Sequence, residues 1–233
     1  LGWAQAWRSP QPKARYDAIV IGGGGHGLAT AYYLAKNHGI TNVAVIEKGW
    51  LGGGNTGRNT TVVRSNYFFP ESVALYEMAL KLYEGLSRDL NYNIMLSQRG
   101  MLVLAHSGVE MEMSARTVNA MQINGIDAEL FTPDDVRRVA PLLNFEPDAR
   151  YPIYGGVWQG RGGTARHDAV AWGYARAADR FGVDIIQNCE VSDFIIESGR
   201  CRGVRTSRGD IRADRIGMAV AGHSSHVAEK AGF

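Results

Sequence analysis

The sequence predicts an α/β protein with one domain built on a parallel sheet and part of a second domain that has an antiparallel sheet. Three observations support this prediction. A strand, a glycine-rich turn, a helix and a second strand follow one another between residues 16 and 47, as a parallel sheet requires. Helices and short strands then alternate through the middle of the chain. From residue 190 onward the sequence consists of short strands separated by polar turns.

The first of these segments has the features of a single βαβ unit. Residues 16–21 are a largely β-branched run that stops at glycine, which is typical of a buried strand. Helix formers at helical spacing occupy residues 28–37, and Gly39 supplies the expected helix end. Residues 43–46 form a second buried strand, which ends at Glu47.

Apolar spacing and capping residues predict the later elements. We expect a long amphipathic helix over residues 71–90. Its predicted apolar stripe consists of Leu75, Met78, Ala79, Leu82, Tyr83 and Leu86. Further helices are expected at residues 109–124, 133–139 (with Thr132 as N-cap) and 167–181. Further strands are expected at residues 101–105, 183–186, 191–196, 201–206 and 210–220, with a turn-rich β segment at 151–163.

The composition is that of an ordinary globular protein. Of the 233 residues, 45% are hydrophobic and 21% charged, and 25 basic against 23 acidic residues leave a net charge of +2. That balance gives no reason to expect nucleic acid or an anionic membrane as a partner. The uncharged stretch at residues 18–35 contains a glycine cluster that would unwind a helix in lipid. Cys189 and Cys201 have no metal-binding or redox spacing, so we expect no metal site and a cytoplasmic location.

A glycine motif of the dinucleotide-binding type joins the first strand to the first helix. Gly22, Gly24 and Gly27 have the spacing GxGxxG, and the flanking strand and helix provide the required context. Gly22 would permit the tight turn, Gly24 would let a pyrophosphate approach, and Gly27 would let helix and strand pack closely. The N–H groups at the helix N-terminus, around Gly25 and His26, would then bind the phosphates.

The residues after the second strand complete this Rossmann-like site. Glu47 would accept hydrogen bonds from the ribose hydroxyls, and its neighbour Lys48 is a further candidate for cofactor binding. The glycine motif alone does not distinguish NAD from FAD. The following loop is rich in glycine, amide and hydroxyl groups that suit a pyrophosphate and a ribityl chain, which favours FAD. Its candidate cofactor-binding residues are Asn55, Thr56, Arg58, Asn59 and Thr60.

Three stretches of the sequence resemble FAD-dependent amine oxidoreductases of the glycine-oxidase and sarcosine-oxidase class. They are residues 16–68, which include the glycine motif, residues 89–100 (DLNYNIMLSQRG) and residues 150–191, which include RGGTARHDAVAWG. Within that class the chain resembles the β subunits of heterotetrameric sarcosine oxidases. The resemblance implies a non-covalently bound FAD and oxidation of the N-methyl group of sarcosine. The products would be glycine, hydrogen peroxide and either formaldehyde or methylene-folate.

The resemblance also implies a second flavin and partner subunits. FMN would be attached covalently through a histidine at the junction with the large α subunit, and small γ and δ subunits would complete the assembly. NAD and tetrahydrofolate are expected only on the partner subunit.

The resemblance carries specific roles over to three residues, His167, Arg64 and Val191. The FMN-linking motif matches residues 162–168, so His167 is the expected attachment site, and a neutral imidazole there is a suitable nucleophile. Arg64 lies where monomeric relatives place an arginine that holds the substrate carboxylate, a role that suits a guanidinium fork. The resemblance also places Val191 near the adenine. His26, because it lies inside the glycine motif, is expected to pack beside the flavin rather than to act as an acid or base.

These assignments divide the chain into four expected parts. Residues 1–16 would be an N-terminal arm, 17–66 the FAD-binding βαβ unit with its loop, 67–165 an insertion belonging largely to the substrate domain, and 166–233 a return to the FAD-binding domain. The sequence is expected to be an excerpt of a longer subunit, whose C-terminal part would supply a substrate-binding lysine. Two alternatives stay open. The chain could be a related FAD-dependent oxidase or dehydrogenase acting on glycine, proline or dimethylglycine, or a flavin-binding fragment without activity of its own.

Overall fold

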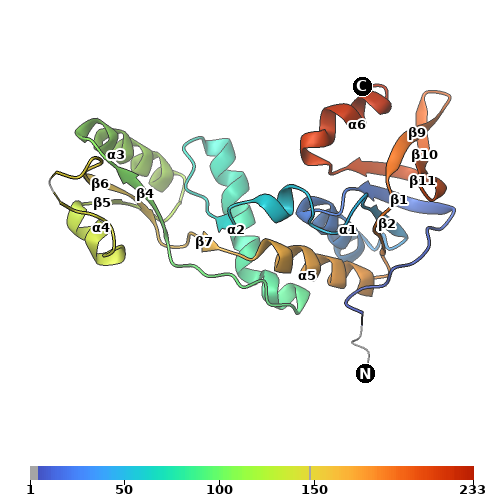
Figure 1. Ribbon diagram of the computed structural model, residues 1–233, viewed down its shortest axis with the longest axis horizontal. Helices are drawn as coiled ribbons and strands as arrows, with labels where there is room; N and C mark the ends of the chain where they lie inside the picture. The colour runs from blue at the N-terminus through green and yellow to red at the C-terminus, as the bar shows by residue number, and fades with distance from the viewer. Residues whose placement is uncertain (1–4, 147) are drawn as a thin grey trace. The chain divides into compact units, whose positions relative to one another are not determined.

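The computed structural model of the chain, which describes residues 5–146 and 148–233, divides into two compact units (Figure 1). The first unit comprises Leu1–Thr60, Ser87–Ile94 and Arg166–Phe233, and the second comprises Thr61–Leu86 and Met95–Ala165. The second unit therefore begins at Thr61, whereas the sequence suggested a boundary after residue 66. The first four residues of the expected N-terminal arm, 1–16, lie outside the described residues.

A six-stranded sheet forms the centre of the first unit. Its strands, in the order β8-β2-β1-β11-β10-β9, are β8 (Asp184–Ile186), β2 (Val43–Ile46), β1 (Arg15–Ile21), β11 (Gly209–Met218), β10 (Arg200–Thr206) and β9 (Val191–Glu197). The strands β8, β2, β1 and β11 are parallel, whereas β10 pairs antiparallel with both β11 and β9. The expected parallel sheet is thus present, and the last three strands extend it as an antiparallel meander.

Two long helices of the first unit pack against each other. They are α1 (Gly25–His38) and α5 (His167–Arg180), and the rings of Tyr32 and Tyr174 meet edge-on between them at 5.6 Å. The helix α1 ends, as expected, at Gly39, whose φ of 66° lies in the left-handed region. The described residues of the unit also form three short helices: η1 (Asn55–Arg58), η2 (Ala221–His223) and α6 (Ser224–Lys230). The sequence did not predict α6, because it is short and has no fully buried side chain.

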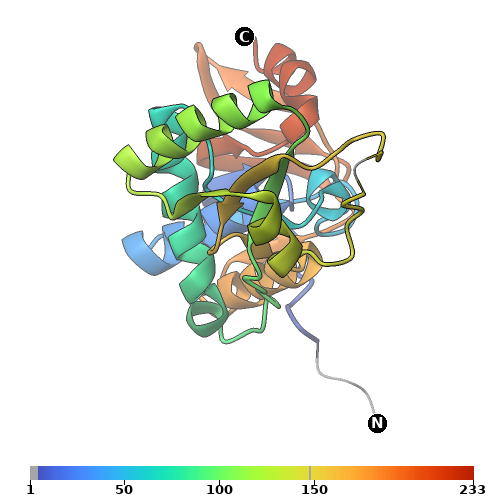
Figure 2. The same ribbon diagram turned by 90° about the vertical axis from the view of Figure 1, so that its left-hand side faces the viewer.

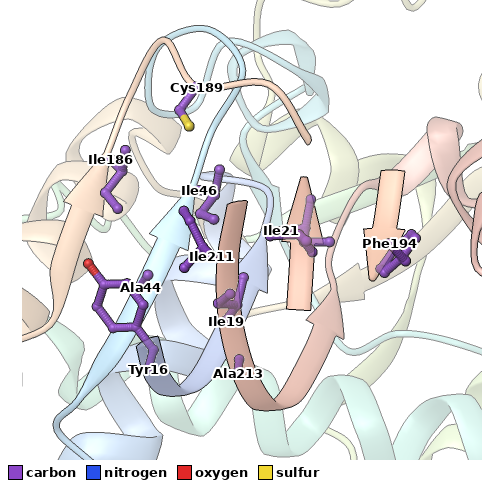
Figure 3. Packing of buried hydrophobic residues seen from close by; sticks show 11 residues of the cluster. Tyr16, Ile19, Ile21, Ala44, Ile46, Ile186, Cys189, Phe194, Ile211 and Ala213 are labelled. Atoms are coloured by element: carbon purple, nitrogen blue, oxygen red, sulfur yellow. The ribbon is translucent and has the colours of Figure 1, made fainter. Parts of the chain in front are cut away.

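Side chains from all six strands of the sheet form a continuous hydrophobic core (Figure 3). The members from β1 and β2 are Tyr16, Ile19, Ile21, Ala44 and Ile46. Others come from the later strands and the connecting segments: Ile186, Cys189, Phe194, Val204, Ile211 and Ala213. Cys189 is a buried free thiol and Cys201 an exposed one. Burial of these apolar groups is what holds the first and last strands of the chain together.

The second unit contains a three-stranded antiparallel sheet with a helix on each face (Figures 1 and 2). The sheet order is β4 (Met101–Ala105), β6 (Gly155–Gln159) and β5 (Ala128–Phe131), and the helices are α3 (Gly108–Ile123) and α4 (Pro133–Val139). A separate two-stranded ladder joins β3 (Val62–Val63) to β7 (Gly163–Thr164). The sequence did not predict β5.

The long helix α2 (Pro70–Leu90) forms as expected, but its buried face differs from the predicted stripe. Leu86 is buried as predicted, together with Val73 and Leu80, which are 3% and 1% exposed. Leu75, Met78 and Leu82 belong to the predicted stripe, yet they are 65%, 63% and 41% exposed. The helix carries apolar residues on more than one side, so spacing alone did not identify the face that packs.

Among the described helices, none is both long enough and apolar enough to cross a lipid bilayer.

Candidate functional site

The glycine motif forms a tightly packed turn between β1 and α1. Gly22 has a φ of 110°, and a Cβ on it would overlap the carbonyl oxygen of Ala219, just beyond the end of β11. A Cβ on Gly27 would overlap the carbonyl oxygen of Gly22. A side chain is therefore excluded at both positions, as the sequence predicted for a tight turn and for close packing of helix against strand.

Glu47, at the end of β2, is bonded to the backbone of this turn. One of its carboxylate oxygens accepts a hydrogen bond from the Gly23 N–H at 2.8 Å, and the other accepts one from the Gly49 N–H at 2.8 Å. Each oxygen has a further lone pair, so these bonds are compatible with the predicted contact to ribose hydroxyls. The structure thus adds a second role for Glu47, which is to fix the turn relative to the second strand.

The N-terminus of α1 retains free backbone donors. The Gly25 N–H, which was expected to face a phosphate, donates to Thr56 Oγ1 at 2.9 Å. Within the described part of the chain, the N–H groups of Gly24, His26 and Gly27 donate to no acceptor. Because a helix N-terminus carries partial positive charge, these three amides fit an anion such as a diphosphate.

The loop after β2 brings one predicted side chain to the turn and leaves the others in solvent. Thr56 is half-buried beside Gly24 and Gly25. The remaining candidates from this region are exposed: His26, Lys48, Asn55, Arg58, Asn59 and Thr60. Val191 is half-buried at the start of β9, and the nearby Cys189 N–H donates to the Glu47 carbonyl oxygen at 2.9 Å. Val191 therefore lies two residues from a backbone hydrogen bond to Glu47, and its contact with the adenine stays a prediction.

His167 opens the helix α5 and lines a cavity of about 230 Å³ within the first unit. Its Nδ1 atom is buried, and it has no hydrogen-bond partner among the described residues. The cavity is lined by Trp7, Trp50, Leu51, Gly52, Thr56, Gly57, His167, Asp168, Trp172 and Gln187. The sequence did not single out the three tryptophans, since they are far apart along the chain and follow no motif.

The residues on either side of His167 fix the start of α5. Arg166 Nε donates to Asp168 Oδ1 at 3.0 Å, and this hydrogen bond holds the pKa of the Asp168 carboxyl below its usual range. Asp168 Oδ1 also accepts from the Ala169 N–H at 2.8 Å, so a negative charge lies in the first turn of the helix, where the dipole favours it.

Arg64 lies directly after β3 in the second unit. Its Nη1 donates to the Asn66 carbonyl oxygen at 3.2 Å and to Asn66 Oδ1 at 2.7 Å. The guanidinium carbon lies 4.3 Å from the centre of the Tyr67 ring. No hydrogen bond from Nε or Nη2 is found to any described residue. The edge of the fork formed by Nε and Nη2 therefore fits a carboxylate.

No group of three or more acidic, histidine or cysteine side chains arranged to hold a metal ion is found among residues 5–146 and 148–233.

Comparisons with known proteins identify a family and several relatives. A family model described as FAD dependent oxidoreductase matches residues 17–233. The chain is 59% identical over 231 residues to sarcosine oxidase subunit beta of Rhizobium meliloti, covering 99% of this chain and 55% of that protein. It is 58% identical over 232 residues to sarcosine oxidase subunit beta of Rhodobacter capsulatus, covering 100% of this chain and 56% of that protein.

A solved structure has a similar fold. L-proline dehydrogenase from P. horikoshii has a TM-score of 0.87 and 26% sequence identity, with 95% of this chain and 57% of that chain covered. The chain thus spans about half the length of the relatives it matches. The family model covers the glycine turn, Glu47, Arg64 and His167 alike, and the chain belongs to the FAD dependent oxidoreductase family.

Proposed function

We propose that the chain is the FAD-binding part of a sarcosine oxidase β subunit, which oxidises the N-methyl group of sarcosine. The similarity to two bacterial β subunits supports the choice of substrate. The observation in the structure that carries the proposal is the buried, partnerless Nδ1 of His167 at a tryptophan-lined cavity, within the described part of the chain. Such an atom is costly unless a group from outside the chain engages the ring, as attachment of a flavin would.

FAD fits the glycine turn of the first unit. The free amides of Gly24, His26 and Gly27 would bind the diphosphate, and Glu47 would bind the ribose hydroxyls. Val191 would lie near the adenine. When bound, FAD supplies the acceptor for the two electrons removed from the amine. The chain itself supplies position and charge for that chemistry.

Arg64 is the proposed ligand of the sarcosine carboxylate. Asn66 holds Nη1, so Nε and Nη2 are left to donate two parallel hydrogen bonds to the two carboxylate oxygens. A substrate held at its carboxylate has one fixed end, and the position of its N-methyl group then depends on how firmly Arg64 is held.

His167 is the proposed attachment site of a second flavin, FMN. The cavity beside it is lined by Trp7, Trp50 and Trp172, which offer ring faces to a planar group. We infer that a large α subunit covers this region and that small γ and δ subunits complete a heterotetramer. NAD and tetrahydrofolate would bind to the partner subunit only.

Mass spectrometry of the full-length subunit, purified with its partners, tests the proposal. We expect the peptide that contains His167 to carry the added mass of FMN, and His167→Ala to lose acid-stable flavin while keeping dissociable FAD. The wild type should oxidise sarcosine and release hydrogen peroxide. An unmodified peptide in an active wild-type enzyme would contradict the FMN assignment. It would favour the alternative of an oxidase or dehydrogenase acting on glycine, proline or dimethylglycine. A yellow protein that oxidises none of these amines would instead be a flavin-binding part without activity of its own.

A further inference from the structure

The segment that follows Arg64 is held by a buried polar network in the second unit. Four residues of the described chain are both polar or charged and buried, and three of them lie here: Ser65, Asn66 and Gln159. Buried polar groups cost free energy unless their hydrogen bonds are made, so a concentration of them next to one arginine calls for an explanation.

Gln159, at the end of the central strand β6, makes three side-chain hydrogen bonds within this network. Its Oε1 accepts from the Ser65 N–H at 3.0 Å. Its Nε2 donates to Ser65 Oγ at 2.7 Å and to Asp127 Oδ1 at 3.0 Å. Ser65 Oγ in turn donates to Glu77 Oε2 at 2.7 Å. Both the backbone and the side chain of Ser65 are therefore fixed by one glutamine.

Arg161, two residues further along the chain, joins the carboxylates around this network. Its guanidinium donates to Glu77 Oε1 at 2.6 Å and to both oxygens of Glu84, at 2.9 and 3.0 Å. Its backbone N–H donates to Asp127 Oδ2 at 2.7 Å. Burial would raise the pKa of the Glu77 carboxyl, but the hydrogen bonds from Arg161 and Ser65 outweigh it and leave this pKa below its usual value. Glu77 thus stays charged and links Arg161 to Ser65.

The other side of Arg64 is held by backbone pairing. In the β3–β7 ladder, Val62 pairs with Thr164 and Val63 with Gly163, and the Ala165 N–H donates to the Thr61 carbonyl oxygen at 3.0 Å. The strand pair therefore fixes the chain directly before Arg64, and the polar network fixes the chain directly after it.

We propose that Gln159 and Arg161 are positioning residues for Arg64. They fix Ser65 and through it Asn66, and Asn66 sets the direction of the Arg64 fork by accepting both N–H groups of Nη1. The inference rests on the proposed role of Arg64 as ligand of the substrate carboxylate. A loosened network would leave Arg64 charged but misdirected, so its effect would fall on substrates that have a carboxylate.

Steady-state kinetics of the full-length subunit with its partners tests this inference. Gln159→Leu removes the three hydrogen bonds at similar size, and Arg161→Lys keeps the charge but loses the fork. The matched control is Gln122→Leu, the same change in the same unit, at a glutamine that donates to the Ala128 carbonyl oxygen outside this network. Each variant is assayed with sarcosine and with sarcosinamide, which has a neutral amide in place of the carboxylate.

We expect Gln159→Leu to lower kcat/KM for sarcosine about 10-fold, mainly through KM, as for the loss of buried hydrogen bonds. Arg161→Lys should lower kcat/KM for sarcosine by less, about threefold, because the lysine keeps the positive charge. Values for sarcosinamide and for Gln122→Leu should stay near those of the wild type. In an Arg64→Ala background, Gln159→Leu should have no further effect on sarcosine.

Two results would overturn the inference. One is an equal loss for sarcosine and sarcosinamide, which would indicate a general structural role. The other is an unchanged KM for sarcosine in Gln159→Leu and Arg161→Lys, when Arg64→Ala does raise this KM. If Arg64→Ala itself leaves the sarcosine KM unchanged, the proposed role of Arg64 fails first. Should Gln159→Leu fail to assemble, Arg161→Lys provides the same comparison.

Discussion

At the scale of single residues, the glycine turn depends on two close approaches between backbone atoms. A methyl group on Gly22 would overlap the carbonyl oxygen of Ala219, and one on Gly27 would overlap that of Gly22. A methyl group on Gly24 would meet only the Thr56 hydroxyl. The turn therefore tolerates no side chain at two of the three motif positions.

We predict that Gly27→Ala abolishes FAD binding, because the added methyl would push α1 away from the turn that presents its amides. The measurement is the ratio of flavin to protein absorbance in the purified full-length subunit. Gly108→Ala is the control, since Gly108 also lies at the start of a helix and has no atom within 4 Å of the added Cβ. Normal flavin content in Gly27→Ala would show that the turn can shift without loss of its site.

At the scale of elements, α2 offers two leucines on different sides of one helix. Leu80 is 1% exposed and Leu82 is 41% exposed. Leu80→Ala should lower the free energy of unfolding by about 2–5 kcal/mol through lost burial and a cavity. Leu82→Ala should change it by no more than about 0.5 kcal/mol. Thermal unfolding of the two variants checks this, and equal shifts would mean that Leu82 is packed as well as Leu80.

A buried tyrosine ties the first strand of the sheet to its edge strand. The Tyr16 hydroxyl donates to Asp184 Oδ2 at 3.0 Å and accepts from the Lys13 N–H at 3.0 Å. Burial, reinforced by Asp184, raises the pKa of Tyr16 to about 12 from 10.0. Between these values the unfolded tyrosine ionises before the folded one, so the stability that Tyr16 contributes is complete below pH 10 and is lost as the pH rises toward 12.

We predict that Tyr16→Phe removes this part of the pH dependence. Going from pH 9 to pH 11, the wild type should lose about 1 kcal/mol more unfolding free energy than the variant does. At neutral pH the variant should be less stable by about 1–2 kcal/mol, since buried Asp184 loses a donor. Urea unfolding at the two pH values measures both effects, with Tyr151→Phe as a control at an exposed tyrosine. Parallel pH profiles for the wild type and Tyr16→Phe would contradict the assignment.

At the scale of the whole molecule, the sheet of the first unit closes only with the last strands of the chain. The strand β1 pairs with β11 along its length, from Arg15 opposite Arg212 to Ile21 opposite Met218. We predict that a chain ending at residue 190, which lacks β9, β10 and β11, shows no cooperative unfolding of the first unit by circular dichroism. A chain ending at residue 223, which lacks α6 and the three residues after it, should keep that transition. Cooperative melting of the shorter chain would mean that β2 and β8 suffice.

The sequence predicts what is set by neighbours and misses what is set by distant contacts. The βαβ unit, Gly22, Gly27 and the capped helix at Pro133–Val139 follow from signals within a few residues. The bonds between Ser65 and Gln159 join residues 94 apart, and no local pattern marks them. The tryptophans around His167 and the packed face of α2 were missed for the same reason, since each depends on which surfaces meet.

The split of the first unit over three stretches of chain has a consequence for biosynthesis. While the ribosome is still making the second unit, the hydrogen-bonding edge of β1 that pairs with β11 is unpaired. It stays unpaired until β11, some 200 residues later in the chain, has emerged. At about 5–20 residues per second, the wait lasts on the order of ten seconds or more. A nascent chain with such an open edge is a natural client for a chaperone, and slower translation of the middle segment would lengthen its exposure to aggregation.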